Sequence, residues 1–289
     1  MGLFHVSLAA LLAFAGQDAQ EPEQEAPESA EAESTSGASP WQAQIFSNFA
    51  NWTEEELAQR DAWDLAHRCG GTFIAEGWVL TAAHCISQEK VDKGYRVRLG
   101  ADYLDNDEGV TFRIDRMVRH ADWNKAAHAY DIALVHYVAD AETRVSNAGP
   151  IAAIPLYEGP PLEAGQLVYA TGWGQLEEGK DKGFSSELTA AELTTVNCAD
   201  YPQYEGKVAE YQLCAGPREP GDTVDTCTGD SGGPLVLEGD EPALVGVVNW
   251  GIGCFRENSA GIYLRIDREN FRDWIDRAMA ADPSVNELR

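Results

Sequence analysis

The chain has 289 residues, with 48 Asp and Glu against 21 Lys and Arg, and a formal net charge of −27. This length suits one large domain or a double-barrel domain with tails. The charge argues against binding to nucleic acid or to anionic membrane surfaces, and it is not confined to one end, since the chain beyond residue 59 still carries 38 acids against 21 bases.

The first 39 residues form two segments that cannot build a core. Leu3 to Ala15 is an apolar run that ends in Ala13-Phe14-Ala15-Gly16, a small-residue pattern typical of signal-peptide cleavage. It is too short to span a membrane. Residues 16–39 are rich in Glu, Ala, Ser and Pro and have almost no large apolar side chains. We therefore predict a signal peptide over residues 1–15 and an acidic, disordered linker over residues 16–39.

Short strand-like segments with Gly and Pro punctuation follow and predict an all-β sandwich or barrel. They are Thr72–Ile74, Trp78–Thr81, Arg96–Leu99, Thr111–Val118, Ile132–His136, Gln166–Thr171, Ala190–Val196, Tyr211–Ala215, Pro234–Leu237, Ala243–Asn249 and Gly261–Arg265. Two segments favour helix instead. Thr53-Glu54-Glu55-Glu56 is a capping box before a short helix, and residues 268–281 place Phe271, Trp274 and Ile275 at helical spacing.

Six cysteines in an acidic, lysine-poor chain indicate an oxidising compartment. Six cysteines can pair in fifteen ways, so spacing alone does not give the connectivity. Zinc ligation is the alternative, but the sequence has no CxxC pair and no His and Cys cluster.

Three separated motifs supply a His, an Asp and a Ser, in that order. They are Thr81-Ala82-Ala83-His84-Cys85, Tyr130-Asp131-Ile132-Ala133-Leu134-Val135 and Asp225-Thr226-Cys227-Thr228-Gly229-Asp230-Ser231-Gly232-Gly233-Pro234. A serine hydroxyl is a weak nucleophile that needs a base, and the base needs an orienting acid. Glycines beside the serine let the backbone approach a reacting carbonyl and donate to the oxyanion that forms. Taken alone, the Gly-Asp-Ser-Gly-Gly string also fits an ordinary turn.

The chain order and the flanking residues of these motifs resemble the trypsin-like, chymotrypsin-fold serine protease family, from about Pro40 to Ala281. The resemblance implies an all-β fold of two six-stranded antiparallel β-barrels with a C-terminal helix, in a domain over residues 40–281 followed by a tail over residues 282–289. Pro40 to Ile45 resembles the first barrel strand. The chain between Ile45 and Cys69 is longer than the family usually has, and by analogy it would stand on the leaving-group side of the cleft.

The resemblance also implies roles for residues. Ser231 is the nucleophile, His84 the general base and acid, and Asp131 the group that orients the imidazole, while the N–H groups of Gly229 and Ser231 form the oxyanion hole. The implied disulfides are Cys69–Cys85, Cys198–Cys214 and Cys227–Cys254. The other histidines, His5, His67, His120, His128 and His136, have no catalytic counterpart; His128 is expected to border the cleft, and the rest are interpreted as surface or structural.

Specificity follows from the same resemblance. Asp225 stands six residues before Ser231, where trypsin-like enzymes keep a carboxylate at the bottom of the primary pocket. Gly251 and Gly261 match wall positions where side chains would block the pocket, and Trp250-Gly251 resembles the edge that pairs with extended substrate. A desolvated carboxylate in an open slot favours Arg or Lys. The alternative is that Asp225 is simply one more acid in an acid-rich chain.

Three features depart from the family. No Ile-Val-Gly-Gly-like motif after a basic residue precedes Pro40, since the first basic residue is Arg60. We therefore expect either a different partner for Asp230 or a different activation route. Asn249 stands where the family usually has a serine that touches the orienting acid. The loop 101–109 carries four acids but does not match the family's calcium loop, so calcium binding stays open there and no metal or cofactor is predicted.

The sequence thus predicts a secreted or periplasmic endopeptidase that cuts after Arg or Lys. Its expected partners are protein or peptide substrates with Arg or Lys before the scissile bond, and the resemblance also allows protein protease inhibitors. Neither nucleic acid nor a membrane span is expected. The alternative is a latent or catalytically silent homologue that acts as a binding module, motivated by the missing activation motif.

Overall fold

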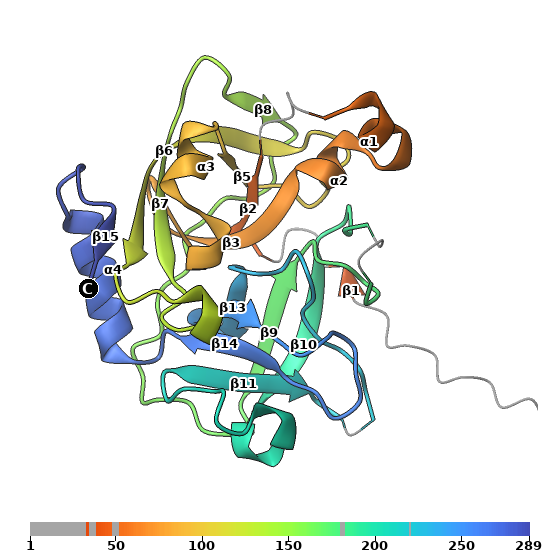
Figure 1. The fold of residues 1–289 in the computed structure, drawn as a ribbon, viewed down its shortest axis with the longest axis vertical. Helices are drawn as coiled ribbons and strands as arrows, with labels where there is room; N and C mark the ends of the chain where they lie inside the picture. Colours follow the sequence, from red (N-terminus) through yellow and green to blue (C-terminus); the bar gives the residue numbers. More distant parts are fainter. Residues whose placement is uncertain (1–32, 35–38, 48–51, 180–182, 220) are drawn as a thin grey trace, which may run out of the picture.

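Two closed six-stranded antiparallel barrels make up most of the computed structural model (Figure 1), which describes residues 33–34, 39–47, 52–179, 183–219 and 221–289. In the first barrel the strands follow the order β2-β3-β4-β7-β6-β5, and a β5–β2 pairing closes it. Their bounds are β2 (Gln42–Phe46), β3 (His67–Ala75), β4 (Trp78–Thr81), β5 (Arg96–Leu99), β6 (Gly109–His120) and β7 (Ala133–Val138). The predicted fold class is confirmed.

The second barrel has the order β9-β10-β11-β14-β13-β12, closed between β12 and β9. Its strands are β9 (Leu167–Gly172), β10 (Thr189–Val196), β11 (Gln212–Pro217), β12 (Pro234–Leu237), β13 (Ala243–Trp250) and β14 (Gly261–Arg265). Three short strands add to the barrels: β1 (Glu33–Ser34) pairs with β10, β8 (Arg144–Ser146) pairs with β6, and β15 (Glu287–Leu288) pairs in parallel with β6.

The C-terminal helix α4 (Glu269–Ala280) packs against the first barrel, although it follows the last strand of the second (Figure 1). It buries Phe271, Trp274 and Ile275 in the cluster that fills the first barrel. The indole N–H of Trp274 donates to the carbonyl of Leu288 at 2.8 Å, which holds β15 beside the helix. The residues predicted to be a tail therefore close over the outside of the first barrel.

The long connection between β2 and β3 contains helices α1 (Glu54–Gln59) and α2 (Ala62–Ala66). The predicted capping box is present: Thr53 N–H donates to Glu56 Oε2 at 2.8 Å, and Glu56 N–H donates to Thr53 Oγ1 at 3.2 Å. The expected single helix is broken at Arg60, whose φ of −145° is extended. Arg60 instead forms a bidentate ion pair with Asp64 of α2, at 2.5 and 2.7 Å.

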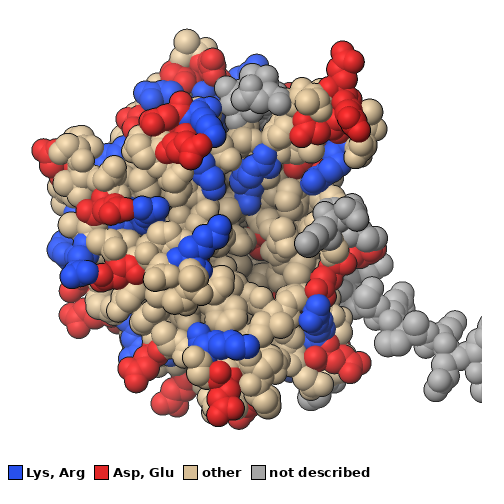
Figure 2. All heavy atoms as spheres, viewed as in Figure 1, with Lys and Arg blue, Asp and Glu red and all other residues tan. Residues whose placement is uncertain are grey.

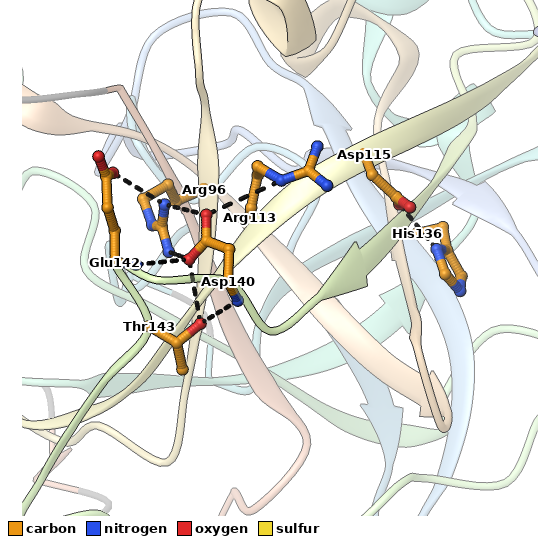
Figure 3. Close-up of polar contacts among 7 residues, drawn as sticks. All are labelled: Arg96, Arg113, Asp115, His136, Asp140, Glu142 and Thr143. Atoms are coloured by element: carbon orange, nitrogen blue, oxygen red, sulfur yellow. Dashed lines mark hydrogen bonds and ion pairs between the residues drawn. The ribbon is translucent and has the colours of Figure 1, made fainter.

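A polar network ties β5 and β6 to the loop after β7, on the outside of the first barrel (Figure 3). Arg96 donates to Asp140 at 2.8 and 3.1 Å and to Glu142 at 3.3 Å, while Thr143 donates to Asp140 at 3.2 Å. Arg113 Nε lies 3.8 Å from the same carboxylate. The Arg96 hydrogen bonds lower the pKa of Asp140 to about 2, so the pair stays charged across the physiological range.

Most of the predicted signal peptide and linker lies outside the described residues. The exception is β1, at positions 33–34, whose backbone pairs with Ala190 and Thr189 of β10. Every helix in the described part of the chain is too short or too polar to cross a membrane.

Candidate active site

His84, Asp131 and Ser231 come from three loops between the barrels. His84 lies in the 3-10 turn η2 (Ala83–Cys85) after β4, Asp131 lies two residues before β7, and Ser231 lies in the turn before β12. His84 and Ser231 line one cleft with a volume of about 720 Å³. The fold thus brings the three predicted residues together from distant parts of the chain.

The Asp131 carboxylate holds His84 at two points. The backbone N–H of His84 donates to Oδ1 at 2.9 Å, and the ring Nδ1 lies 2.7 Å from Oδ2. The Asp131 side chain is fully buried, whereas 28% of the His84 side chain is exposed. Since the carboxylate can only accept, Nδ1 carries the proton and Nε2 is left as the basic nitrogen. The Ser231 hydroxyl has no hydrogen bond within the described chain; such contacts often form only when substrate binds.

Gly229 and Ser231 present backbone amides at the same turn. Gly229 has a φ of +106°, and a Cβ there would lie 2.9 Å from the Phe184 ring, so the position requires glycine. Gly70 N–H donates to the carbonyl of Ser231 at 2.9 Å and ties the turn to the first barrel. Neither the Gly229 N–H nor the Ser231 N–H finds an acceptor among the residues described. Both can therefore donate to an oxyanion.

His67 lies fully buried next to this turn, in a position whose role the sequence did not indicate. Its Nε2 lies 3.0 Å from the carbonyl of Gly229, and its Nδ1 lies 3.2 Å from the amide nitrogen of Gln44. Because that amide can only donate, Nδ1 accepts and Nε2 donates to Gly229. Burial lowers the pKa of His67 to about 4, so the ring stays neutral. The one sequence feature that could have indicated a role for His67 is its position two residues before Cys69.

The Asp230 carboxylate anchors the turn from below. It is buried, and it accepts the N–H of Gly174 and of Cys227, both at 2.8 Å. A Cβ on Gly172 or Gly174 would lie 2.0 or 2.2 Å from its oxygens, so both glycines make room for it. Burial raises the pKa of Asp230 to about 6, and no Lys or Arg in the described chain pairs with it. Asp230 borders a second cavity, of about 440 Å³, which Ala190 next to β1 also lines.

Asp225 lies behind the cleft rather than on its surface. Gly251 and Gly261 line the cleft, as expected, but Asp225 lines the second cavity, which shares Thr226 with the cleft. Burial raises the pKa of Asp225 to about 7, although the N–H groups of Thr226 and Phe255 lower it by hydrogen bonding. The carboxylate is thus close to the floor of the cleft and costly to ionise while it has no cation partner.

Trp250, at the end of β13, lines the cleft and stacks on His128, with ring centroids 5.1 Å apart. His128 therefore borders the cleft, as the sequence suggested. Asn249 does not take over the hydrogen bond to the orienting carboxylate. Its Nδ2 lies 3.5 Å from the main-chain carbonyl of Asp131, and its Oδ1 is buried without a partner in the described chain.

The other described histidines lie outside the cleft. His120 stacks on Tyr130 with centroids 4.6 Å apart, and His136 pairs with Asp115 at 2.7 Å (Figure 3). His5 is outside the described residues. All three disulfides that the resemblance implied are present: Cys69–Cys85, Cys198–Cys214 and Cys227–Cys254. The first is next to His84 and the third braces the Ser231 turn.

In the acidic loop 101–109, one carboxylate is engaged by the loop itself. Glu108 Oε2 accepts the backbone N–H of Asp102 at 2.9 Å and of Tyr103 at 2.8 Å. One of the four acids of the loop, Glu108, therefore caps two backbone N–H groups of the loop itself.

Comparison with known proteins identifies the arrangement. The trypsin family model matches residues 30–275. The chain is 34% identical to a vitellin-degrading protease of Bombyx mori over 73% of this chain and 76% of that protein. It is 31% identical to tissue-type plasminogen activator of Bos taurus, over 82% of this chain but only 41% of that longer protein. Among solved structures, neuropsin, a serine protease of mouse brain, matches with a TM-score of 0.67 and 28% identity, covering 86% of this chain and 98% of that one.

The buried Asp230 carboxylate predicts a distinctive dependence of stability on pH. Its native pKa, about 6, lies above the ordinary value of 3.8, so the native state binds more protons than the unfolded state between these values. The contribution of Asp230 to the free energy of unfolding is therefore present at low pH and lost as pH rises through about 6. We compare two proteins that both carry Ser231→Ala, one with Asp230 and one with Asp230→Asn. As pH rises from 4 to 7, the free energy of unfolding of the Asn protein should increase relative to that of the Asp protein, by on the order of 3 kcal/mol.

Denaturant unfolding of the two proteins across that pH range measures the difference. Any constant cost of placing an amide next to two N–H donors cancels, because only the change with pH counts. Parallel stability curves would mean that a cation holds the carboxylate ionised in the native protein.

Proposed function

We propose that this chain, which belongs to the trypsin family of serine proteases, hydrolyses peptide bonds after Arg or Lys with Ser231 as nucleophile, His84 as general base and Asp131 as orienting acid. Family membership makes it a serine endopeptidase that acts on protein substrates. One observation carries the residue roles. A fully buried Asp131 fixes Nδ1 of His84 at 2.7 Å, in a cleft that Ser231 also lines.

The proposed reaction proceeds in two halves. Ser231 Oγ attacks the scissile carbonyl while His84 Nε2 takes the hydroxyl proton, and the N–H groups of Gly229 and Ser231 stabilise the oxyanion. The C–N bond then breaks, and His84 gives the proton to the leaving amine. Water, activated by the same nitrogen, attacks the acyl-enzyme and releases Ser231. Throughout, Asp131 keeps the imidazole in one tautomer and stabilises its protonated form.

The preference for Arg or Lys is inferred from Asp225. Gly251 and Gly261 leave space at the cleft wall, and a long cationic side chain has the reach for a carboxylate just behind the floor. A partly buried carboxylate with a raised pKa gains most from such a cation, because the pair replaces an uncompensated charge. The backbone of the substrate would pair with the exposed edge at Trp250.

The missing Ile-Val-Gly-Gly-like motif leaves two hypotheses open, a different partner for Asp230 or a different activation route. Asp230 already accepts two N–H groups, and the cavity that it borders has room for a further group. We infer that either an unidentified cationic group occupies this cavity or the enzyme works as a single chain. The alternative function, a silent homologue that only binds other proteins, is favoured only by the missing activation motif. The three disulfides support a secreted or periplasmic location.

Ser231→Ala is expected to abolish turnover, by on the order of 10⁵-fold or more, and to leave the fold intact. Protein that begins at Gly16 is incubated with a small Arg amide substrate while its intact mass is recorded. Turnover at unchanged mass identifies an active single-chain enzyme, whereas turnover only after a mass loss locates an activation cleavage. If the folded protein shows no turnover, either at unchanged mass or after a mass loss, the result would contradict the proposed function and favour the binding module.

Asp225→Ser is expected to remove the preference for Arg and Lys over neutral residues before the scissile bond. In the parent enzyme, the ratio of kcat/KM for an Arg substrate to that for a neutral one should fall as pH drops below about 7, where Asp225 becomes protonated. A pH effect on the shared catalytic steps acts on both substrates alike and cancels in the ratio. An Asp225→Ser enzyme that still prefers Arg would show that the carboxylate does not set specificity.

His67→Phe is expected to lower kcat by roughly 10- to 100-fold with little change in KM, because it removes the hydrogen bond to the Gly229 carbonyl. His67→Gln, which keeps a donor at this position, should retain more activity. Equal losses in both variants, together with equal loss of stability, would show that His67 serves only packing.

A further inference from the structure

Three basic side chains surround His84 on a chain that is otherwise strongly acidic. Lys125 lines the cleft, and Lys90 Nζ donates to the carbonyls of His84 at 3.3 Å and Cys85 at 2.8 Å. Arg68 lies close enough that its charge and that of Lys125 both lower the pKa of Lys90, after the larger effect of burial. Figure 2 shows Lys and Arg gathered around the hollow on this face, with Asp and Glu mostly towards its outline.

None of these three cations forms an ion pair with an acid of the described chain. Arg60 provides the contrast, because it also lines the cleft but its charge is matched by the bidentate pair with Asp64. Arg68, Lys90 and Lys125 share their lack of an ion pair with bases elsewhere in the described chain, such as Arg116 and Lys207, and differ from them in lying near His84.

Neutral groups hold Arg68 and Lys90 in place. Arg68 Nη1 donates to the backbone carbonyl of Leu65 at 2.6 Å and to a second carbonyl at 2.7 Å, and its guanidinium lies 5.3 Å from the Trp52 ring. Lys90 Nζ lies 5.6 Å from the Tyr95 ring, in addition to its two carbonyl acceptors. Carbonyls and rings fix the position of a cation without cancelling its charge. Both side chains are half-buried, so little further ordering is needed when an acid binds.

The position of these cations relative to the scissile bond follows from the contacts of Ser231. The glycine-walled slot and the edge strand at Trp250 line the same cleft as Ser231, and under the proposed function the substrate residues that precede the bond run along them. Gly70 donates to the Ser231 carbonyl, and the Cys69–Cys85 disulfide lies beside that carbonyl, with Cys85 Sγ 3.5 Å from it. Arg68 directly precedes this disulfide in the chain, and Lys90 caps the carbonyl of Cys85.

We propose that Arg68 and Lys90 form a binding site for acidic side chains in the two or three substrate residues that follow the scissile bond. This inference rests on the proposed function, because it extends the same cleft to its leaving-group side. The substrate class would be proteins with Arg or Lys followed closely by Asp or Glu. Such a site attracts acidic side chains at short range, and salt weakens the attraction.

The test uses internally quenched peptides that share an Arg and all residues before the scissile bond. After the bond they carry either Ser-Asp-Glu, Ser-Asn-Gln or Ser-Lys-Lys. At low salt we expect kcat/KM to be about tenfold higher for the acidic peptide than for the neutral one, and lowest for the basic one. The advantage should shrink as salt is raised. Hydrolysis of a small Arg amide, which ends at the scissile bond, is measured beside them.

Matched variants assign the effect to residues. Arg68→Gln and Lys90→Gln should each reduce the ratio of acidic to neutral peptide about threefold, and the double variant should bring it close to one. Arg68→Lys should retain most of it. Lys207→Gln is the control for net charge: Lys207 also donates to a carbonyl, at 3.0 Å, but that carbonyl belongs to Gln203 in the connection between β10 and β11 of the second barrel, so the ratio should not change.

Binding of the same peptides to the Ser231→Ala protein separates this inference from the proposed function. If the protein hydrolyses the Arg amide but cleaves the acidic and neutral peptides at equal rates, the acidic-site proposal is overturned and the proposed function stands. Absence of hydrolysis, with tighter binding of the acidic peptide that the double variant loses, overturns the proposed function and supports the site. An acidic peptide without Arg that binds as tightly as the full peptide would assign the surface to polyanions in general and overturn the substrate preference.

Discussion

A carboxylate buried without a cation is costly, and the Ser231 turn lies over a buried carboxylate for which the described part of the chain supplies no cation. Asp230 accepts two backbone N–H groups, from Gly174 and Cys227, and its pKa rises to about 6. Two glycines, at positions 172 and 174, leave the space that its oxygens occupy. The backbone amides of Gly229 and Ser231 flank Asp230 in the same turn. The protonation state of Asp230, or its pairing with a cation, is therefore coupled to the geometry of the proposed oxyanion hole.

The second constraint is that the site is divided between two barrels and must be held in register. His84 and Asp131 belong to the first barrel, and their own contacts do not position Ser231. Two of the polar contacts that cross the junction reach the Ser231 turn from β3: Gly70 N–H donates to the Ser231 carbonyl, and His67 donates to Gly229. Both begin on β3, and the neighbouring disulfide at Cys69 stiffens that strand next to His84. β3 therefore helps to hold the Ser231 turn in register with His84, although it carries neither residue.

The sequence predicted those strands whose first and last residues are determined by neighbouring residues in the chain. The bounds of β4, β5, β12 and β14 agree with the strand-like segments read from the sequence. The first half of β3 was missed because His67 to Gly71 includes two glycines and becomes a strand only by pairing with β2. β15 was missed for the same reason, since its parallel partner β6 is far away in the chain.

At the candidate site, the spacing of the motifs predicted which residues take part. Spacing does not predict which of two neighbouring cavities a side chain lines. Asp225 therefore lines a different cavity from the one expected, and Asn249 contacts a carbonyl instead of the Asp131 carboxylate.

Net charge and local field are separate properties here, and the difference bears on what the cleft can recognise. A charge of −27 disfavours anionic partners at long range, which salt screens beyond about 10 Å. Within the cleft, the nearest charges dominate, and on the leaving-group side these are cations held by carbonyls and aromatic rings rather than by acids. In the proposed function, Asp225 provides negative charge for the residue before the scissile bond. Taken together, the two proposals imply that a substrate meets negative charge before the scissile bond and positive charge after it. This polarity orients an extended peptide as well as selecting it, since the reversed chain would place like charges together at both ends.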